Sequence, residues 1–493
     1  MGILEKFLEE ARMNIRKWFS LIVAGLAVVV NAGWAAPRDE IVSTAADQTG
    51  VAVTIYNDNL ALVKDARRVR LGRDANQLAW REVSAQMRPE TAQLRNLSNP
   101  AGFRLLEQNF DFDLLTPQKL LEKYVGREVG VIRTNPGTGM ETRESATVLS
   151  TNNGVVLKFA DGRIETGVPG RLAFPGVPDT LRDTPTLVIS LLNPVAGMQN
   201  LELSYLTGGL SWRADYVAEL NADDDRLDLN GWVTLTNQSG AAYPNAKLQL
   251  VAGDLHRVRD EQPMPRAVMA MAAKGADTSE LRQESLLEYH LYTLQRPTTL
   301  ANNQTKQVAL MSASRVPVRK SFLLEGANYY YTGKVGEIGR KTKVGVFIEF
   351  DNAGEGLGVP LPRGVIRVYK KDGQGNAQFV GEDRIDHTPK NETVRLKLGE
   401  AFDVTADKTQ TDFQKLGGTG RYNAVFESAY QFVLKNAKPV AVTVTVREPM
   451  PGDWTMLSES QPHAKVASGM AEWKVSVPAE GKATLDYRVR VRY

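Results

Sequence analysis

The chain has 493 residues, enough for about three domains. Of these residues, 42% are hydrophobic and 24% charged, a balance that is typical of a globular protein and excludes a disordered or membrane-embedded chain. The formal net charge is only +3. Since the sequence has no basic stripe, we expect neither nucleic acid nor an anionic membrane surface as an obligate partner.

Cysteine is absent from the sequence. Disulfides, thiolate catalysis, zinc–thiolate sites and a lipid anchor on cysteine are therefore excluded. No chemistry-bearing motif outweighs a structural explanation of the same residues. We accordingly predict no cofactor, no metal site and no catalytic residue.

Residues 13–35 have the three parts of a secretory signal peptide: a basic head, an apolar run over residues 18–30, and small residues before a cut after Ala35. The run is shorter than the roughly 20 residues that span a membrane, although an uncleaved anchor is the alternative. We predict that Met13 is the true start, with residues 1–12 upstream of it. The protein is then expected in the periplasm or at the cell surface of a Gram-negative-type envelope, without a transmembrane helix after signal removal.

From residue 45 onward the sequence consists mostly of short strand-like runs. Residues 51–56 and 60–63 are apolar runs, and the Asn-Asp-Asn sequence at residues 57–59 separates them as a turn would. We predict an N-terminal β domain over residues 45–115.

A short helix and several tight hairpins follow. Thr116 fits a helix N-cap, Pro117 the first helical position, and Gly126 ends the segment. Asn-Gly at residues 153–154 and Asp-Gly at residues 161–162 fit two-residue hairpin turns, which require positive φ. This spacing predicts a small five-stranded barrel module over residues 116–185.

The C-terminal region, residues 186–493, alternates apolar and polar residues in many short runs. In the last run Leu485, Tyr487, Val489 and Val491 alternate with arginines, as in a strand with one buried face. Turn residues separate the runs, which favours sandwiches over βαβ units. We predict an all-β fold of β-sandwich domains with the small barrel inserted.

One stretch of this region, about residues 256–285, departs from the alternation, because it is rich in Ala and Met and ends in a charged run. We predict a mobile loop here. The alternative is an amphipathic segment that contacts a membrane or a partner through Met264, Met269 and Met271.

Four stretches of the second half have a family pattern, and they cover residues 203–216, 235–250, 288–292 with 305–308, and 447–454. In this order they resemble the C-terminal domain of the mucoidy-inhibitor A-like bacterial proteins, a family of unassigned biochemical function. The strands around residues 55–89 resemble the family's N-terminal β domain. Its typical members have a coiled coil between the halves, whereas this chain has no heptad run and has the small barrel there. The family's name derives from an effect on exopolysaccharide production.

Aromatic residues in these stretches have a structural interpretation. Trp212 and Tyr216 follow two glycines at residues 208–209, and a strand after such a kink would bury the indole. Asn237 and Tyr243 fit a turn at a sheet edge. An aromatic platform for a ligand is the alternative.

Four histidines are present: His256, His290, His387 and His463. None belongs to an HExxH motif and their spacing gives no local metal site. His290 would share a strand face with Glu288 and Tyr292, which we interpret as a solvated polar face rather than a catalytic or metal-binding one.

Two further motifs have ordinary explanations. The acidic run at residues 223–225, followed by Asp228, suggests calcium but lacks the spacing and final Glu of an EF-hand, so we favour a solvated turn. The Gly-Gly-Thr-Gly-Arg sequence at residues 417–421 lacks the ending of a phosphate-binding loop, so we favour a hairpin loop.

These observations lead to three functional hypotheses. The preferred one is an exported, non-enzymatic cell-envelope protein that binds a polysaccharide or another envelope protein. The alternative is an envelope glycan or peptide hydrolase with a dispersed active site of carboxylates and His290 or His387, since a dispersed triad leaves no sequence spacing. The second alternative is an outer-membrane β-barrel, because Tyr493 ends a strand of alternating character.

Overall fold

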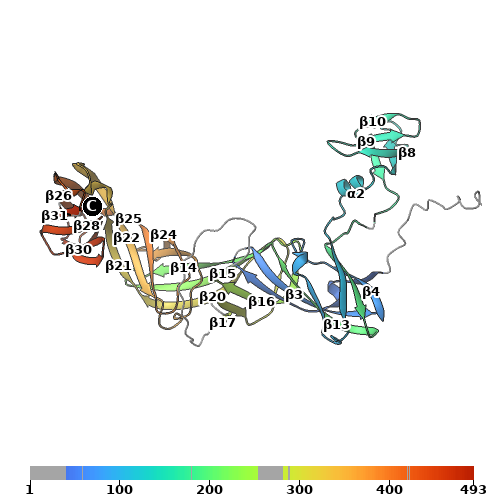
Figure 1. The fold of residues 1–493 in the computed structure, drawn as a ribbon, viewed down its shortest axis with the longest axis horizontal. Helices are drawn as coiled ribbons and strands as arrows, with labels where there is room; N and C mark the ends of the chain where they lie inside the picture. Colours follow the sequence, from blue (N-terminus) through green and yellow to red (C-terminus); the bar gives the residue numbers. More distant parts are fainter. Residues whose placement is uncertain are drawn as a thin grey trace, which may run out of the picture.

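The structure is a computed structural model that describes residues 40–57, 59–178, 180–253, 281–286, 289–418, 420 and 422–493. It is an all-β protein, as the sequence predicts, with the sheets arranged in an elongated row from the N-terminal to the C-terminal region (Figure 1). The predicted signal peptide lies outside the described residues, and so do residues 254–280 of the predicted loop. Among the described residues, no helix is long and apolar enough to cross a membrane.

A four-stranded sheet lies at the N-terminal end. Its strands in spatial order are β1 (Glu40–Ser43), β4 (Asp74–Arg81), β12 (Thr186–Asn193) and β6 (Arg104–Asp111). The 3₁₀ turns η1 (Ala45–Asp47) and η2 (Pro89–Thr91) lie in the connections of this region. Strand β12 follows the inserted module in the chain, yet it pairs with both β4 and β6.

An eight-stranded sheet packs beside it. Its strands are β17 (Leu281–Leu286), β18 (Tyr289–Leu294), β16 (Tyr243–Ala252), β2 (Gln48–Tyr56), β3 (Leu60–Leu71), β13 (Gly197–Thr207) and β5 (Gln93–Asn96), with β19 (Thr298–Leu300) on β16. The predicted turn between β2 and β3 is present, and Val53, Ile55 and Val63 of the two predicted apolar runs are buried. Because β16 pairs with β2 and β13 with β3, residues from both halves of the chain complete this sheet.

The prediction of a loop over residues 256–285 was wrong for the last five of these residues. Residues 281–285 belong to strand β17, which pairs antiparallel with β18. This pairing gives their backbone groups regular hydrogen-bond partners, so the charged run is part of a strand at the sheet edge.

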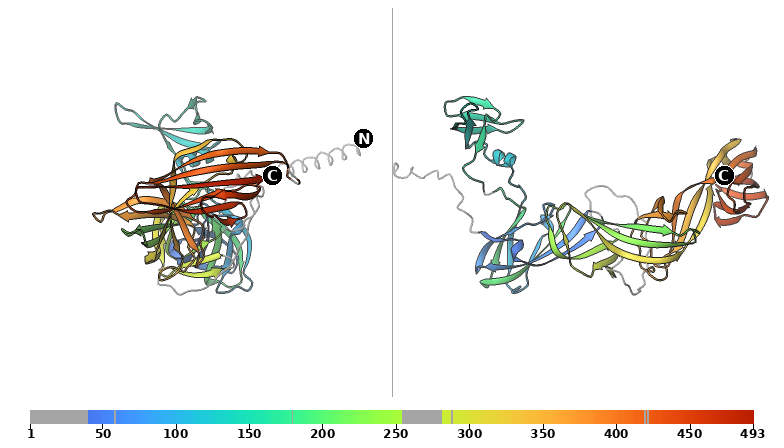
Figure 2. Two further views of the ribbon diagram at one scale, coloured as in Figure 1. Left: turned by 90° about the vertical axis from the view of Figure 1, so that its left-hand side faces the viewer. Right: turned by 180° about the vertical axis from the view of Figure 1, so that it is seen from behind.

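The inserted module has a core of its own and projects from the N-terminal sheets (Figures 1 and 2). Its helix and its five antiparallel strands in spatial order are α2 (Pro117–Lys123), then β10 (Ile164–Thr166), β9 (Val156–Phe159), β8 (Glu141–Ser150), β7 (Glu128–Thr134) and β11 (Arg171–Ala173). The Thr116 hydroxyl caps α2 by accepting from the backbone N–H of Lys119. Asn153, Gly154 and Gly162 have the predicted positive φ, but Asp161 does not. The connections are also longer than the predicted two residues, because β8 ends at Ser150 and β9 begins at Val156, and β9 ends at Phe159 and β10 begins at Ile164.

A five-stranded sheet lies in the middle of the row. Its strands are β20 (Gln304–Pro317), β15 (Arg226–Asn237), β14 (Leu210–Leu220), β23 (Gly364–Lys371) and β24 (Ala377–Ile385). Buried Leu and Val side chains of this sheet join those of the two N-terminal sheets in one continuous core. The predicted burial of Trp212 and Tyr216 is confirmed in that core, since they are 5% and 0% exposed.

A nine-stranded sheet forms the C-terminal end and surrounds a second core. Its strands are β28 (Asp453–Glu459), β31 (Lys482–Arg492), β26 (Val425–Asn436), β25 (Thr393–Leu416), β22 (Glu337–Asp351), β21 (Arg319–Glu325), β27 (Val442–Pro449), β30 (Met470–Val477) and β29 (Ala464–Ala467). The 3₁₀ turn η3 (Tyr329–Tyr331) packs inside it. The predicted inward face of β31 is confirmed, because its four apolar side chains are at most 2% exposed.

Two long strands connect the cores. On β22, Phe350 belongs to the first core and Val344 to the second; on β25, Leu396 and Val404 divide in the same way. Shifts in register between these strands lie near the change from one core to the other. Both strands belong to the C-terminal sheet, and their side chains contribute to both cores.

Candidate functional site

The β14–β15 hairpin ends in the acidic run that suggested calcium. Its turn is organised by Asn221, whose Oδ1 accepts from the backbone N–H groups of Asp225 and Arg226, both at 3.1 Å. Asp224 has φ of +60°, a left-handed conformation that Asp tolerates better than most residues. The turn therefore presents the Asp224 carboxylate in a fixed position.

Two ammonium groups occupy that carboxylate. Lys320 of β21 donates to Oδ2 at 2.7 Å and Lys370 of β23 donates to Oδ1 at 2.6 Å. Burial alone would raise the pKa of Asp224, but the two lysine hydrogen bonds outweigh it and lower the pKa below its ordinary value. The turn thus fastens the middle sheet to the C-terminal sheet through a charged triad instead of offering its carboxylate to a cation.

A cavity of about 900 Å³ lies on one side of this hairpin. Its charged lining comes from four strands and one loop, and comprises Glu219, Arg226, Asp228, Arg315, Glu355 and Lys371. The volume falls in the range of small-molecule sites, roughly 300–1,000 Å³. Since no aromatic residue lines it, the cavity suits a hydrophilic ligand.

Strand β20 is irregular where it borders the cavity. Its register against β15 shifts between Leu227 and Leu229, and Arg315 has φ of +53°. The Arg315 N–H donates to Oδ1 of Asp228 at 2.7 Å, and the Arg226 guanidinium donates to the Arg315 carbonyl at 3.2 Å. Left-handed backbone at a non-glycine residue and bulges of this kind concentrate at functional sites.

The charges of the cavity are only partly paired. Lys371 and Glu219 form an ion pair at 2.6 Å, and the hydrogen bond that Lys371 donates to Glu219 raises the pKa of Lys371. Arg226 and Arg315 are exposed, and within the described part of the chain neither guanidinium has a carboxylate partner. These two groups are therefore available to an anionic ligand.

A smaller cavity of about 230 Å³ lies on the other side of the hairpin. Leu220 borders both cavities, and the Asp224–Lys320–Lys370 triad lines the smaller one. Its remaining walls are mostly apolar residues of β22, β24 and β25. Because its lysines are already paired, the smaller cavity is a weaker candidate than the larger one.

A family model described as a domain of unknown function (DUF4139) matches residues 201–493, more than half of the chain. The chain belongs to the DUF4139 family. Among curated proteins none matches it. Both cavities lie within the DUF4139 domain, which begins inside strand β13.

The histidines of the DUF4139 domain have separate local roles. His290 lies on β18, where burial lowers its pKa. His387 accepts from the backbone N–H of Arg363 at 3.2 Å, and His463 lies 2.9 Å from Glu459. None of these three lines either cavity; His256 lies outside the described residues.

Trp212 and Tyr216, the aromatic residues noted in the sequence, belong to the core of the DUF4139 domain. The Trp212 indole donates to the Val251 carbonyl at 3.3 Å, and the Tyr216 hydroxyl donates to the Pro362 carbonyl at 2.9 Å. The Asn237 amide donates to the carbonyl groups of Ala241 and Ala301. Their burial confirms the structural interpretation and leaves no exposed platform there.

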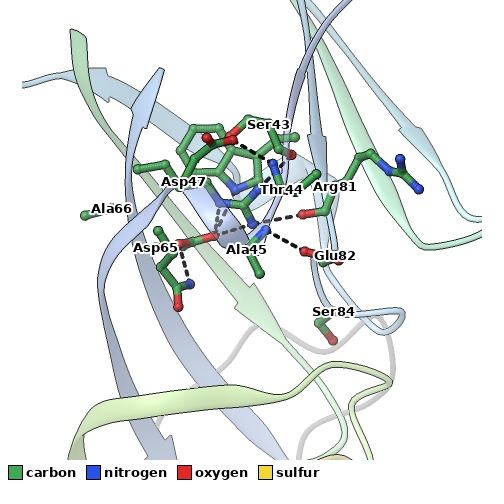
Figure 3. A network of polar contacts seen from close by, with 12 residues as sticks. Ser43, Thr44, Ala45, Asp47, Asp65, Ala66, Arg81, Glu82 and Ser84 are labelled. Atoms are coloured by element: carbon green, nitrogen blue, oxygen red, sulfur yellow. Dashed lines mark hydrogen bonds and ion pairs between the residues drawn. The ribbon is translucent and has the colours of Figure 1, made fainter. Parts of the chain in front are cut away.

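A buried polar network lies outside the DUF4139 domain and was not predicted from the sequence. Arg67 is 1% exposed; it pairs with Asp65 at 2.8 Å and donates to the carbonyl groups of Ser43 and Arg81. Trp80 also donates to Asp65, at 2.9 Å. Figure 3 shows Ser43, Asp65 and Arg81, which belong to three different strands, gathered around this network. The network fastens β1 and β4 to β3, so its role is structural.

Proposed function

We propose that the chain is an exported, non-enzymatic cell-envelope protein that binds an anionic polysaccharide in the larger cavity of its DUF4139 domain. The observation that carries the proposal is the pair of guanidinium groups, Arg226 and Arg315, on a strained bulge beside a polar cavity of about 900 Å³. Guanidinium groups bind carboxylates in bidentate fashion, and charged side chains accept and donate to sugar hydroxyls.

The resemblance to mucoidy-inhibitor A-like proteins supports the same ligand class. The resembling stretches at residues 203–216 and 235–250 lie in strands β13 to β16. The hairpin of β14 and β15 borders the cavity. We extend to this chain the family's association with exopolysaccharide. The proposed location of this protein, in the periplasm or at the cell surface, depends on the signal peptide predicted at residues 13–35.

The cavity lining favours binding over hydrolysis. Of the three carboxylates that line it, Glu219 is engaged by Lys371 and Asp228 by the backbone N–H of Arg315, whereas Glu355 has no such partner among the described residues. A glycosidase needs one carboxyl as an acid and a second as base or nucleophile. Since Glu355 is the single unengaged carboxylate of the described lining, we assign Glu219 and Asp228 to positioning of the cationic groups.

The proposal is tested by co-sedimentation of the purified chain with an insoluble polyuronate and with an insoluble neutral glucan. We expect retention on the polyuronate only, and loss of retention in the Arg226→Ala/Arg315→Asn double variant, since Asn tolerates the positive φ at position 315. Arg70→Ala removes an exposed arginine on β3, far along the chain from the cavity, and serves as control.

Assay of the same mixtures for new reducing ends tests the non-enzymatic part. Release of reducing ends that is lost in His290→Ala or His387→Ala would identify a hydrolase and refute the proposal. Equal retention of wild type and double variant would refute the assigned cavity.

A further inference from the structure

The C-terminal core contains a lysine and a glutamate that are buried together. Lys408 of β25 and Glu448 of β27 have side chains 8% and 0% exposed. The Lys408 Nζ lies 2.8 Å from Oε1 and 2.7 Å from Oε2 of Glu448. These nearly equal distances show that the nitrogen contacts both oxygens of the carboxylate.

Aromatic rings enclose this pair. Nζ lies 3.6 Å from the ring centre of Tyr330, 4.6 Å from that of Phe432 and 5.3 Å from that of Tyr430. Burial lowers the pKa of Lys408 to about 8, although Glu448 opposes the shift. Burial therefore makes the neutral amine of Lys408 easier to reach than that of an exposed lysine.

The two oxygens of Glu448 have different partners. Tyr331 donates to Oε2 at 2.8 Å and Tyr487 at 3.1 Å, and the Tyr330 hydroxyl donates to the same atom. Among the described residues, Oε1 accepts only from Lys408. A Cβ at Gly326 would lie 2.2 Å from Oε1, so the glycine keeps this side of the carboxyl clear.

We propose that Lys408 and Glu448 condense to form an amide cross-link inside the C-terminal core. An ammonium proton of Lys408 first moves to Oε1. The nitrogen lone pair then bonds to Cδ, while the electron pair of the Cδ–Oε2 double bond moves onto Oε2, where the three tyrosine hydroxyls stabilise the charge. As that double bond re-forms, the Cδ–Oε1 bond breaks and Oε1 leaves as water with a second proton from the nitrogen. The reaction consumes no other reactant and releases one water.

The fold favours this reaction over a persistent ion pair. The amine is held within hydrogen-bond distance of both oxygens of the carboxyl group it attacks, so the two reacting groups are already in contact. A buried ion pair is, by contrast, often no more stabilising than apolar residues of similar volume. The product would also join β25 to β27, which are separated in the sheet by β22 and β21. In a chain without cysteine, it would serve as a covalent bridge across the core.

Intact-mass and peptide-map spectrometry of the full chain tests the proposal. We expect wild type to be lighter than its sequence mass by one water and to yield a linked peptide that contains both Lys408 and Glu448. Lys408→Met removes the amine and should have its full sequence mass. Lys435→Met alters a half-exposed lysine on the neighbouring strand β26, paired with Asp407, and should keep the loss of water.

Masses are compared between variants, so that removal of a leader affects all of them equally. Recovery of the Lys408 and Glu448 peptides as separate, unmodified species from folded wild type would overturn the proposal. A loss of water that persists in Lys408→Met would overturn it as well, because the modification would then lie elsewhere.

Discussion

Asp65 and Arg67 lie two residues apart on the inward face of strand β3 and pair at 2.8 Å in the N-terminal core. Their side chains are 6% and 1% exposed. The ring of Trp80 lies over the guanidinium, with its centre 4.5 Å from Cζ, and shields it from water on that side. A buried charge in this position is strongly destabilising when its partner is removed.

Substituting Arg67 with Met should lower the free energy of unfolding of the N-terminal region by about 3–5 kcal/mol, because Asp65 is left buried without its counter-charge. Denaturant unfolding followed by Trp80 fluorescence measures this change. The matched control is Arg81→Met, which breaks the more exposed pair with Asp183 and should cost about 0–1 kcal/mol. Similar losses in the two variants would contradict the role assigned to the network.

The Asp224 triad should make stability depend on acid pH. The folded-state pKa of Asp224 is lower than its unfolded value of 3.8. Its contribution is therefore fully present above pH 3.8 and is lost as the pH falls through the folded-state pKa. Unfolding measured at a series of pH values should show the difference between wild type and Asp224→Asn shrinking below pH 3.8. A constant difference would mean that the carboxylate does not bind Lys320 and Lys370 in the folded protein.

Deleting residues 484–493 should unfold the C-terminal core. The deletion removes the buried side chains of Leu485, Tyr487, Val489 and Val491. Each is worth about 1.5–3 kcal/mol, and their sum approaches the roughly 5–15 kcal/mol that stabilises a domain. Limited proteolysis should then digest the nine-stranded sheet while the N-terminal core resists. A truncated chain with an intact protease-resistant C-terminal fragment would contradict this prediction.

Export should yield a mature protein that begins near Ala36. The basis is the sequence order of residues 13–35, a basic head followed by an apolar run and small residues. N-terminal sequencing of the chain from an isolated envelope fraction measures the cleavage point. Recovery of the chain with residues 13–35 intact would favour an uncleaved anchor instead.

Local patterns in the sequence predicted much of the fold. Apolar runs separated by a turn identified β2 and β3, alternation identified the inward face of β31, and the glycine kink before Trp212 indicated a buried indole. The pairing of β2 with β16 was not predictable, since the partners lie about 195 residues apart, as the hydrogen bond between Thr54 and Gln249 illustrates. Local periodicity specifies which face of a strand is buried, but not which distant strand lies beside it.

The site residues were harder to predict than the strands. Asp65 and Arg67 share the alternation of the buried Val63 and Val69, and that register was an overlooked signal of a buried pair. The positive φ of Arg315 has no sequence signature, because arginine rarely adopts it. Such features depend on tertiary contacts that override local preference, as functional and strained sites often do.

The central claim is that Arg226 and Arg315 bind an anionic polysaccharide, and calorimetric titration of the purified chain with a soluble polyuronate tests it most directly. The account predicts saturable binding to wild type and to Arg70→Ala, weakened at least tenfold in Arg226→Ala/Arg315→Asn, which is about 1.4 kcal/mol. Binding should also weaken with added salt. Equal affinity of wild type and double variant, or no binding to either, would contradict the account.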